Sequence, residues 1–319
     1  MNRKKLGGLA LAVCLGVASA QGQQKIERTK TIKDDSVSRT DTDLRWTHTS
    51  SDGKNEVSLT IRNAQFNDDY TDVESIMPGG SFRISEEREG VARRLEITRE
   101  ADGQLKRVYA LGGEARPYDA AARAWLAKLL SETVAGSGYD APGRVVKVLA
   151  KRGVDGVLTE IARLKTDYAR RVYASALIER GKLNGAQLAK LLGQMARDIT
   201  SDYEKATLLI KAVHLDVNDA GGRSAFFEAT NTIKSDYERR RVLSALFKRS
   251  DLSRETLLLA VKIVDGMDSD YEKANVLIGA ARVKAADEEV DSAIRKAALA
   301  LKSDHERGRV LTVVARKQS

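Results

Sequence analysis

Ser235-Asp236-Tyr237-Glu238 is one of three identical tetrads that decide how this chain folds. The same four residues occur at Ser201–Glu204 and Ser269–Glu272, and weaker copies begin at Thr166 and Ser303. The later starts are 34 residues apart, and the first gap is 35. A fixed period of roughly 20 to 50 residues is typical of a stacked repeat array. The tetrad therefore predicts that one structural unit recurs along much of the chain.

Each tetrad has the sequence of a helix N-terminus. In a capping box, a Ser or Thr oxygen accepts from the main-chain N–H of a Glu three residues later, and the Glu side chain accepts from the N-cap N–H. The Asp between them adds negative charge at the positive end of the helix dipole. The predicted cap residues are Thr166, Ser201, Glu204, Ser235, Glu238, Ser269, Glu272, Ser303 and Glu306.

Two helical patterns fill each period. Apolar residues follow each tetrad at helical spacing, and second patterns span Ala186–Met195, Phe226–Ile233, Leu257–Met267 and Val290–Leu301. A large apolar residue two positions before each cap marks a short connection, which makes neighbouring helices antiparallel. Because one pair cannot bury both its faces, we expect an α-solenoid of helical hairpins of ~34 residues over 166–319. An irregular leading helix pair is expected over 140–165, after a loop at Gly136–Gly143.

The third residue of the tetrad forms a column of aromatic side chains: Tyr168, Tyr203, Tyr237 and Tyr271, with His305 in the last copy. One interpretation is a packing residue at each seam, with its hydroxyl at the rim. The other is a ladder of side chains that face a ligand. Repeated residues in solenoids are mostly structural, which favours the first interpretation.

Residues 44–135 follow a different pattern. Apolar and polar residues alternate on both sides of Asp52-Gly53, which is typical of a hairpin. Further strands are predicted at Ser81–Glu87, Val91–Thr98 and Leu105–Leu111, with one turn at Pro78-Gly79-Gly80. A helix at Asp119–Thr133 should cover one face, because a lone meander leaves an apolar face exposed. We therefore expect an α+β fold, with a small antiparallel β-meander and its covering helix followed by the array.

The first 43 residues carry no core pattern. Residues 1–20 have a basic start, a short apolar segment and the small residues Ala18-Ser19-Ala20, which is typical of a secretory signal peptide. Cys14, the only cysteine, follows Val13, where a lipoprotein signal would need a small residue. Cleavage after Ala20 would leave a chain without a thiol. We expect an exported protein, periplasmic or extracellular, with a flexible polar linker over 21–43 and no transmembrane segment in the mature chain.

Several of these stretches also resemble a known family. Pro78–Ile84, Arg93–Ile97 and Ala121–Leu126, followed by Ser-Asp-Tyr-Glu helices, are similar to a bacterial exported helical-repeat family. That family resembles the extracytoplasmic region of BlaR-type membrane signalling metallopeptidases, here without the peptidase. The resemblance covers nearly all of the expected mature chain and lies in structural motifs. It implies an interaction or sensory module of the cell envelope, and it transfers no active-site residue to this sequence.

Motifs for catalysis or metal binding do not emerge from the sequence. The histidines are His48, His214 and His305, and Arg309 stands where a zinc-protease helix would need a second His after His305-Glu306. Neither a phosphate-binding loop nor a Gly-x-Ser-x-Gly elbow occurs. Asp68, Asp69 and Asp72 lack the spacing of an EF-hand loop and indicate a solvated acidic turn. We therefore predict no catalytic residue, no cofactor and no metal site.

The charges are mixed rather than strongly basic. The formal net charge is +9. Residues 41–114 contain 15 Asp/Glu and 10 Lys/Arg, whereas residues 166–319 contain 27 Lys/Arg and 22 Asp/Glu. Helix faces with interleaved signs are usually solvated, and nucleic-acid binding would need a stronger bias. No nucleic-acid partner is therefore predicted.

Three functions remain open at this stage. The first is a non-catalytic interaction or sensory module that presents a helical-repeat surface to a protein of the cell envelope. The second is an envelope hydrolase with a site between the sheet domain and the array. The third is a structural protein that binds an anionic envelope polymer. The absence of a catalytic motif favours the first, and oligomeric state is left undecided.

Overall fold

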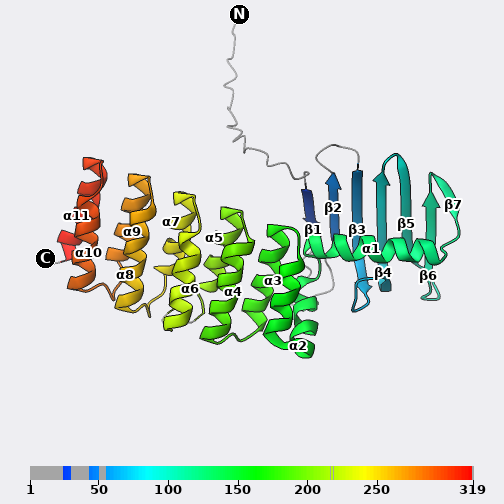
Figure 1. Cartoon of the computed structure of the whole chain (residues 1–319), viewed down its shortest axis with the longest axis horizontal. Helices are drawn as coiled ribbons and strands as arrows, with labels where there is room; N and C mark the ends of the chain where they lie inside the picture. Colours follow the sequence, from blue (N-terminus) through cyan, green and yellow to red (C-terminus); the bar gives the residue numbers. More distant parts are fainter. Residues whose placement is uncertain (1–23, 30–42, 50–54, 216, 218, 318–319) are drawn as a thin grey trace, which may run out of the picture. The chain divides into compact units, whose positions relative to one another are not determined.

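The computed structural model describes residues 24–29, 43–49, 55–215, 217 and 219–317, and it contains two compact units (Figure 1). Unit 1 spans Met1–Thr133 and unit 2 spans Val134–Ser319. The predicted signal peptide and the predicted turn at Asp52-Gly53 lie outside the described residues. Within the described ranges, no helix combines the length and apolar composition that a bilayer crossing needs. The α+β fold, with an N-terminal meander and a helical array, is confirmed.

Unit 1 contains an antiparallel meander in which each strand pairs with the next along the chain. Among the described residues its strands are β1 (Gln24–Thr29), β2 (Asp43–Thr49), β3 (Asn55–Phe66), β4 (Val73–Arg88), β5 (Val91–Arg99), β6 (Leu105–Leu111) and β7 (Glu114–Arg116).

The sheet has one apolar and one polar face, as the alternation in the sequence predicts. On the polar face, Arg83 of β4 pairs with Glu96 of β5 at 2.7 Å. Two rows of fully buried side chains cross the other face in register: Leu59, Ile84 and Leu95, then Ile61, Phe82 and Ile97. Helix α1 (Ala120–Ser137) lies over this sheet in Figure 1 and buries Leu126 and Leu130. The Trp125 indole N–H donates to the Glu86 carboxylate at 2.8 Å, which fixes the helix on β4.

Two local predictions for unit 1 are wrong. Gln24–Thr29, placed in the flexible linker, forms β1 and pairs with β2 from Gln24 opposite His48 to Thr29 opposite Asp43. Strand pairing uses main-chain groups, so the polar composition that indicated a linker did not exclude it. Pro78-Gly79-Gly80 is not a turn between strands, because it lies inside β4.

The glycines of this segment accommodate an irregularity in the sheet. The pairing of β3 with β4 changes register between Arg62 and Ala64, opposite the glycines. Gly79 has a φ of 76°, and a Cβ atom on Gly80 would lie 2.7 Å from the Arg62 carbonyl oxygen. Such a close approach needs glycine, and a bulge is where it commonly occurs in a strand.

Unit 2 contains helical pairs that stack in order along the chain. The first helix of each pair follows a tetrad: α3 (Asp167–Arg180), α5 (Asp202–Ala212), α7 (Asp236–Leu246), α9 (Asp270–Ala281) and α11 (Asp304–Lys317). These first helices stand side by side in Figure 1 and form one layer. The second helices are α4 (Gly185–Asp198), α6 (Ala220–Asn231), α8 (Arg254–Lys262), extended by the 3₁₀ turn η1 (Ile263–Gly266), and α10 (Glu288–Leu299).

The leading segment is helical but broken. Helix α2 (Ala141–Arg163) is interrupted at Gly153, whose φ of 62° and ψ of −166° are not helical. The predicted irregular pair is therefore present as two helical pieces. The predicted loop at 136–143 is shorter, because α1 ends at Ser137 and α2 begins at Ala141. The apolar residues two positions before each cap are all buried: Leu164, Ile199, Ile233, Met267 and Leu301.

The tetrad serines cap their helices through one half of the predicted box. The hydroxyl oxygen of Ser235 accepts from the Glu238 N–H at 3.3 Å, and Ser201, Ser269 and Ser303 make the same bond at 3.3–3.4 Å. In the first copy, Thr166 accepts from the Ala169 N–H at 3.1 Å. Each cap satisfies one of the main-chain donors that a helix start leaves without an intrahelical partner.

The other predicted half of the box, in which the Glu side chain accepts from the N-cap N–H, is wrong. The Asp of the preceding repeat accepts from that N–H instead. The Ser235 N–H donates to the Asp202 carboxylate at 2.8 Å, and the Ser269 N–H donates to Asp236 at 2.7 Å. Asp167 and Asp270 accept in the same way from Ser201 and Ser303, at 2.8 and 2.7 Å. Asp202 and Asp236 also accept from the residue before the cap, Lys234 or Asp268, at 3.0 and 2.7 Å. One carboxylate therefore holds the start of the next repeat.

In two repeats, the residue after the tetrad supports the same connection from its carbonyl side. Lys205 donates to the Thr232 carbonyl oxygen at 3.3 Å, at the end of α6. Arg239 donates to the Ile233 carbonyl at 2.6 Å and also to the Gly266 carbonyl at the end of η1. A cation at a helix C-terminus satisfies free carbonyls and stabilises the negative end of the dipole. The Asp and the cation of one repeat together hold the connection that leads to the next repeat.

Replacing Ser235 or Ser269 by Ala should lower the free energy of unfolding by about 1 kcal/mol in each case, because a helix N-cap is lost. Urea denaturation of each variant measures the difference. Denaturation curves that overlay the parent would contradict the role of the serines as caps.

Replacing Asp236 by Ala should cost more, about 2–3 kcal/mol, because two main-chain N–H groups lose a charged acceptor. The control is Asp304→Ala, since the Asp304 side chain is 91% exposed and contacts Arg307. We expect the control to change stability by less than about 0.5 kcal/mol. Equal losses in the two variants, measured by urea denaturation, would show that the contact between repeats is unimportant.

Candidate functional site

The aromatic column of the tetrads lies on the surface of the first-helix layer. Tyr203, Tyr237 and Tyr271 are 57, 53 and 58% exposed, whereas most large apolar residues of unit 2 are buried. Tyr168 is half-buried, and the His305 side chain is 80% exposed. The favoured interpretation, a packing residue at each seam, is therefore incomplete, because more than half of three of these side chains faces solvent. We call Tyr168, Tyr203, Tyr237, Tyr271 and His305 the tyrosine row.

An arginine covers each tyrosine of the row at the seam between two first helices. The guanidinium carbon lies 4.9–5.7 Å from the ring centroid in four pairs: Arg171 with Tyr168, Arg241 with Tyr203, Arg240 with Tyr237 and Arg309 with Tyr271. Such cation–π contacts contribute roughly 0.5–1 kcal/mol at exposed positions. They also restrict the rotation of rings that would otherwise be mobile in solvent.

The tetrad glutamates hold these arginines. Glu204 accepts from Arg171 at 2.7 Å and Glu238 from Arg241 at 2.6 Å, while Glu272 and Glu306 pair with Arg240 and Arg309. The glutamate side chains are 11–14% exposed, so these pairs are better shielded than ordinary surface pairs. Each of the four seams thus has one Tyr from the earlier helix, one Glu from the later helix and one Arg between them.

The helix that supplies the arginine alternates from seam to seam. Arg171 and Arg240 lie five residues after their own cap and reach forward to the Glu of the next helix. Arg241 and Arg309 lie six residues after their cap and reach back over the Tyr of the previous helix. In the helices without an arginine at the fifth position, small residues occupy it: Ala206, Ala274 and Gly308.

The other predicted residues are not brought together. His214 follows the end of α5, His305 begins α11 in another repeat, and the side chain of His48 lies outside what the structure describes. Asp72 pairs with Arg107 at 3.3 Å. In the described part of the chain, no three His, Cys, Asp or Glu side chains form a group that could hold a metal ion.

Groups with shifted pKa values are dispersed rather than clustered. Burial raises the pKa of Tyr173, and burial together with the nearby Asp72 charge raises that of Tyr118 to about 12. Burial lowers the pKa of Lys205, against the opposing charges of Asp202 and Asp167. Burial of Asp167 opposes ionisation, but bonds from Thr200, Ser201 and Arg170 outweigh it and lower the pKa of this carboxyl. The shift of Tyr118 follows from packing within unit 1 and the others from packing within unit 2, and these dispersed groups do not indicate a catalytic pair.

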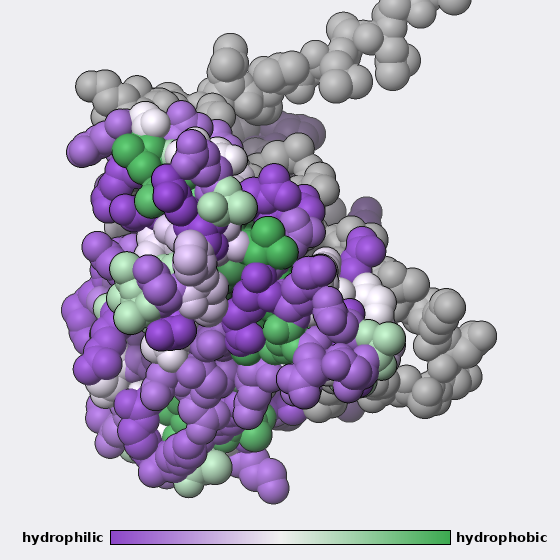
Figure 2. Space-filling model, turned by 90° about the vertical axis from the view of Figure 1, so that its right-hand side faces the viewer, coloured by the Kyte–Doolittle hydropathy of each residue, from purple (hydrophilic) through white to green (hydrophobic). Residues whose placement is uncertain are grey.

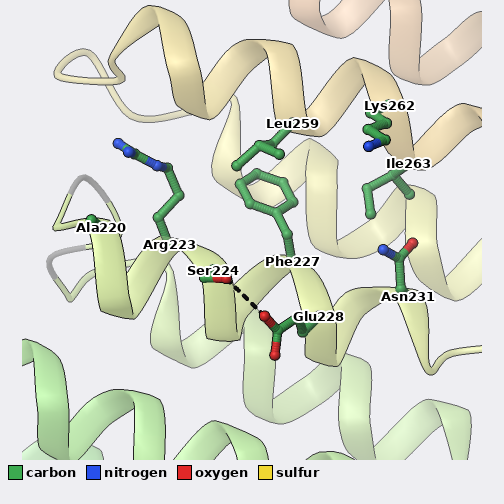
Figure 3. Close-up of a pocket in the computed structure, with 9 residues that line it drawn as sticks. All are labelled: Ala220, Arg223, Ser224, Phe227, Glu228, Asn231, Leu259, Lys262 and Ile263. Carbon is green, nitrogen blue, oxygen red and sulfur yellow. Dashed lines mark hydrogen bonds between the residues drawn. The ribbon is translucent and has the colours of Figure 1, made fainter.

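A small cleft lies on the second-helix side, between α6 and α8 (Figure 3). Its volume is about 360 Å³, and Phe227, Leu259 and Ile263 form its apolar part. Arg223 and Lys262 lie at its two ends, and the Ser224 hydroxyl donates to Glu228 at 2.7 Å. No histidine or cysteine stands among its lining residues in the described chain, and Ser224 and Glu228 lie one turn apart on the same helix.

Unit 1 presents a mainly hydrophilic surface on the side that carries β7 (Figure 2). Hydrophobic side chains appear there in small separated groups. Val91 and Val108 are 46 and 50% exposed. Scattered exposed apolar residues are normal and do not mark a site. The tyrosine row is therefore the stronger candidate surface.

Comparisons of the chain with family models, with curated proteins and with solved structures each returned no match. The resemblance to an exported helical-repeat family consequently stays a prediction. The class that the coordinates define is an α+β protein whose helical array displays a regular aromatic row.

Lowering the pH should remove the stabilisation that the Asp167 carboxylate provides. Its folded-state pKa lies below the ordinary value of 3.8, so the stabilisation is present above that pH and disappears as the pH falls through the folded-state pKa. The difference in free energy of unfolding between the parent and Asp167→Asn should therefore shrink between about pH 6 and about pH 2.5. Urea denaturation along this pH series tests it, and a difference independent of pH would contradict the assigned ionisation.

Proposed function

We propose that this protein is a non-catalytic interaction module that presents its first-helix layer to a protein partner. The observation that carries the proposal is the tyrosine row, in which exposed rings recur at successive seams, each in contact with an arginine. Tyrosine and arginine are enriched among the residues that dominate binding energy at protein interfaces. Rings held in place lose less side-chain entropy on binding than mobile ones, which favours affinity.

The repeat architecture supports the same proposal. Stacked hairpins build an extended surface on which equivalent side chains lie at regular intervals. Neighbouring helices in such a layer are about 8–10 Å apart, so four seams span roughly the width of an ordinary protein interface. We place the partner in the cell envelope because the first 20 residues have the pattern of an export signal. A sensory role within the envelope follows only if the resemblance to the signalling family holds.

Site-specific photo-crosslinking tests this function in the cells that produce the protein. A photoreactive aromatic residue at Tyr203 or Tyr237 should give a covalent adduct with one defined protein. The control is Leu299 of α10, an apolar residue that is 66% exposed and lies outside the tyrosine row. Absence of an adduct at the row, or equal adducts at Leu299, would contradict the proposal. Adducts with polysaccharide alone would favour the polymer-binding alternative.

Truncating the row should separate binding from stability. The variants Tyr203→Ala, Tyr237→Ala and Tyr271→Ala should each lower the free energy of unfolding by less than about 1 kcal/mol, because the rings are largely exposed. At least one should weaken partner binding about tenfold or more, as expected of an interface anchor. Thermal denaturation and titration calorimetry with the crosslinked partner measure the two effects. If the variants bind more weakly only because a fraction of the protein is unfolded, a role of these tyrosines in recognition would be contradicted.

A further inference from the structure

The charge of the tyrosine row does not come from its arginines. Arg171, Arg240, Arg241 and Arg309 each pair with a tetrad glutamate, so the seams are close to neutral. Any preference of this surface for a charged partner must therefore come from other residues of the first-helix layer.

A second column supplies that charge at the opposite end of the first helices. Thirteen residues after each cap lie Glu179, His214, Lys248, Arg282 and Arg316, and all five are exposed. Lys248 and Arg282 form no ion pair with a residue that the structure describes, whereas Glu179 pairs with Lys211. Cations near helix C-termini are favoured by the dipole, which is consistent with Lys248, Arg282 and Arg316 at the ends of the last three first helices. The residue at this position is acidic in α3, a histidine after α5 and basic at the ends of α7, α9 and α11.

A groove between α9 and α11 connects this cationic column with the tyrosine row. It is shallow, with a volume of about 710 Å³, and its lining includes Arg282 from the column, His305 from the tyrosine row and the seam arginine Arg309. Ile278 and Val313 give it apolar surface. Gly308 also lines it, and a Cβ atom there would project into open space. One carboxylate, that of Asp304, lines the groove as well, and it pairs with Arg307 at 3.0 Å.

We propose that the α9–α11 groove binds an acidic, extended polypeptide segment of the partner, with one carboxylate at Arg282. The segment continues beyond the groove to the end of α7, where a second carboxylate meets Lys248. This rests on the proposed function, since it assigns the partner's chemistry. A guanidinium recognises a carboxylate through two parallel N–H donors, so Arg282 is the more specific contact. Apolar side chains between the acidic residues cover Ile278 and Val313.

The spacing of the layer determines the spacing of the acidic residues. Neighbouring first helices are about 8–10 Å apart, so equivalent cations recur at that interval. An extended polyproline-II segment advances about 9 Å in three residues. An acidic residue at every third position can therefore meet successive helices. A sugar polymer is less suitable for this groove, because its lining contains His305 and no tyrosine on which a sugar ring would stack.

Fluorescence anisotropy with the full chain and a labelled peptide of four Glu-Val-Pro triplets tests the proposal. The peptide should bind about tenfold more tightly than the matched Gln-Val-Pro peptide at low ionic strength. The double variant Lys248→Glu/Arg282→Glu should lose about tenfold or more of that affinity. Salt should weaken binding of the Glu peptide, because exposed charges are screened.

The matched control is Arg197→Glu/Lys296→Glu. Arg197 and Lys296 are exposed cations in the last turns of α4 and α10, outside the tyrosine row. We expect this control to stay within about twofold of the parent, and circular dichroism verifies that both doubles fold. Equal losses in the two doubles, or equal affinity for the Glu and Gln peptides, would overturn the proposal. So would tighter binding of an oligogalacturonate probe than of the Glu peptide.

The outcomes separate this proposal from the proposed function. If photo-crosslinking at Tyr203 or Tyr237 yields a protein adduct but the Glu peptide shows no preference, the interaction module stands and the acidic segment is wrong. If no protein adduct forms at the row, the proposed function fails whatever the peptide does.

Discussion

The array depends on the hydrogen bond between the Asp202 carboxylate and the main chain of the next repeat. The carboxylate oxygen accepts from the Ser235 N–H, 33 residues away, at 2.8 Å, and the same contact recurs at Asp167, Asp236 and Asp270. The N-cap N–H of each such helix has its hydrogen-bond acceptor only when the preceding repeat is folded. The contact therefore couples adjacent repeats through hydrogen bonding as well as through apolar burial, which is the nearest-neighbour term of solenoid stability.

The same constraint places the tyrosine row on the surface. The Asp before each tyrosine points to the next connection, and the Glu after it points to the seam arginine. The Tyr237 side chain lies between these two directions and emerges at the seam, 53% exposed. Arg240 then covers its ring and is itself held by Glu272. A surface suited to recognition thus arises from residues whose neighbours are fixed for structural reasons.

Local sequence was sufficient for the helix starts but not for their long-range contacts. Ser235 and Glu238 are three residues apart, so their hydrogen bond could be predicted from the spacing. The partner of Asp202 could not, because it depends on how successive hairpins stack. The exposure of Tyr203 was missed for the same reason. The seam arginines could have been found from the sequence. Aligning the copies places Arg171 and Arg240 at one position of the repeat, and Arg241 and Arg309 at the next. Strand β1 was missed because side-chain composition says little about main-chain pairing.

The seam arginine comes alternately from the earlier and the later helix, so the pattern of the array repeats every two hairpins. If the hairpin beginning at Ser235 were deleted, Ala206 and Asn275 would meet at the new junction, and Tyr203 would have no guanidinium over it. If the hairpins beginning at Ser201 and Ser235 were deleted together, Arg171 would face Glu272, and the seam would be rebuilt. Removing or adding two adjacent hairpins therefore keeps one guanidinium at each seam, whereas removing the hairpin beginning at Ser235 alone leaves a seam without one.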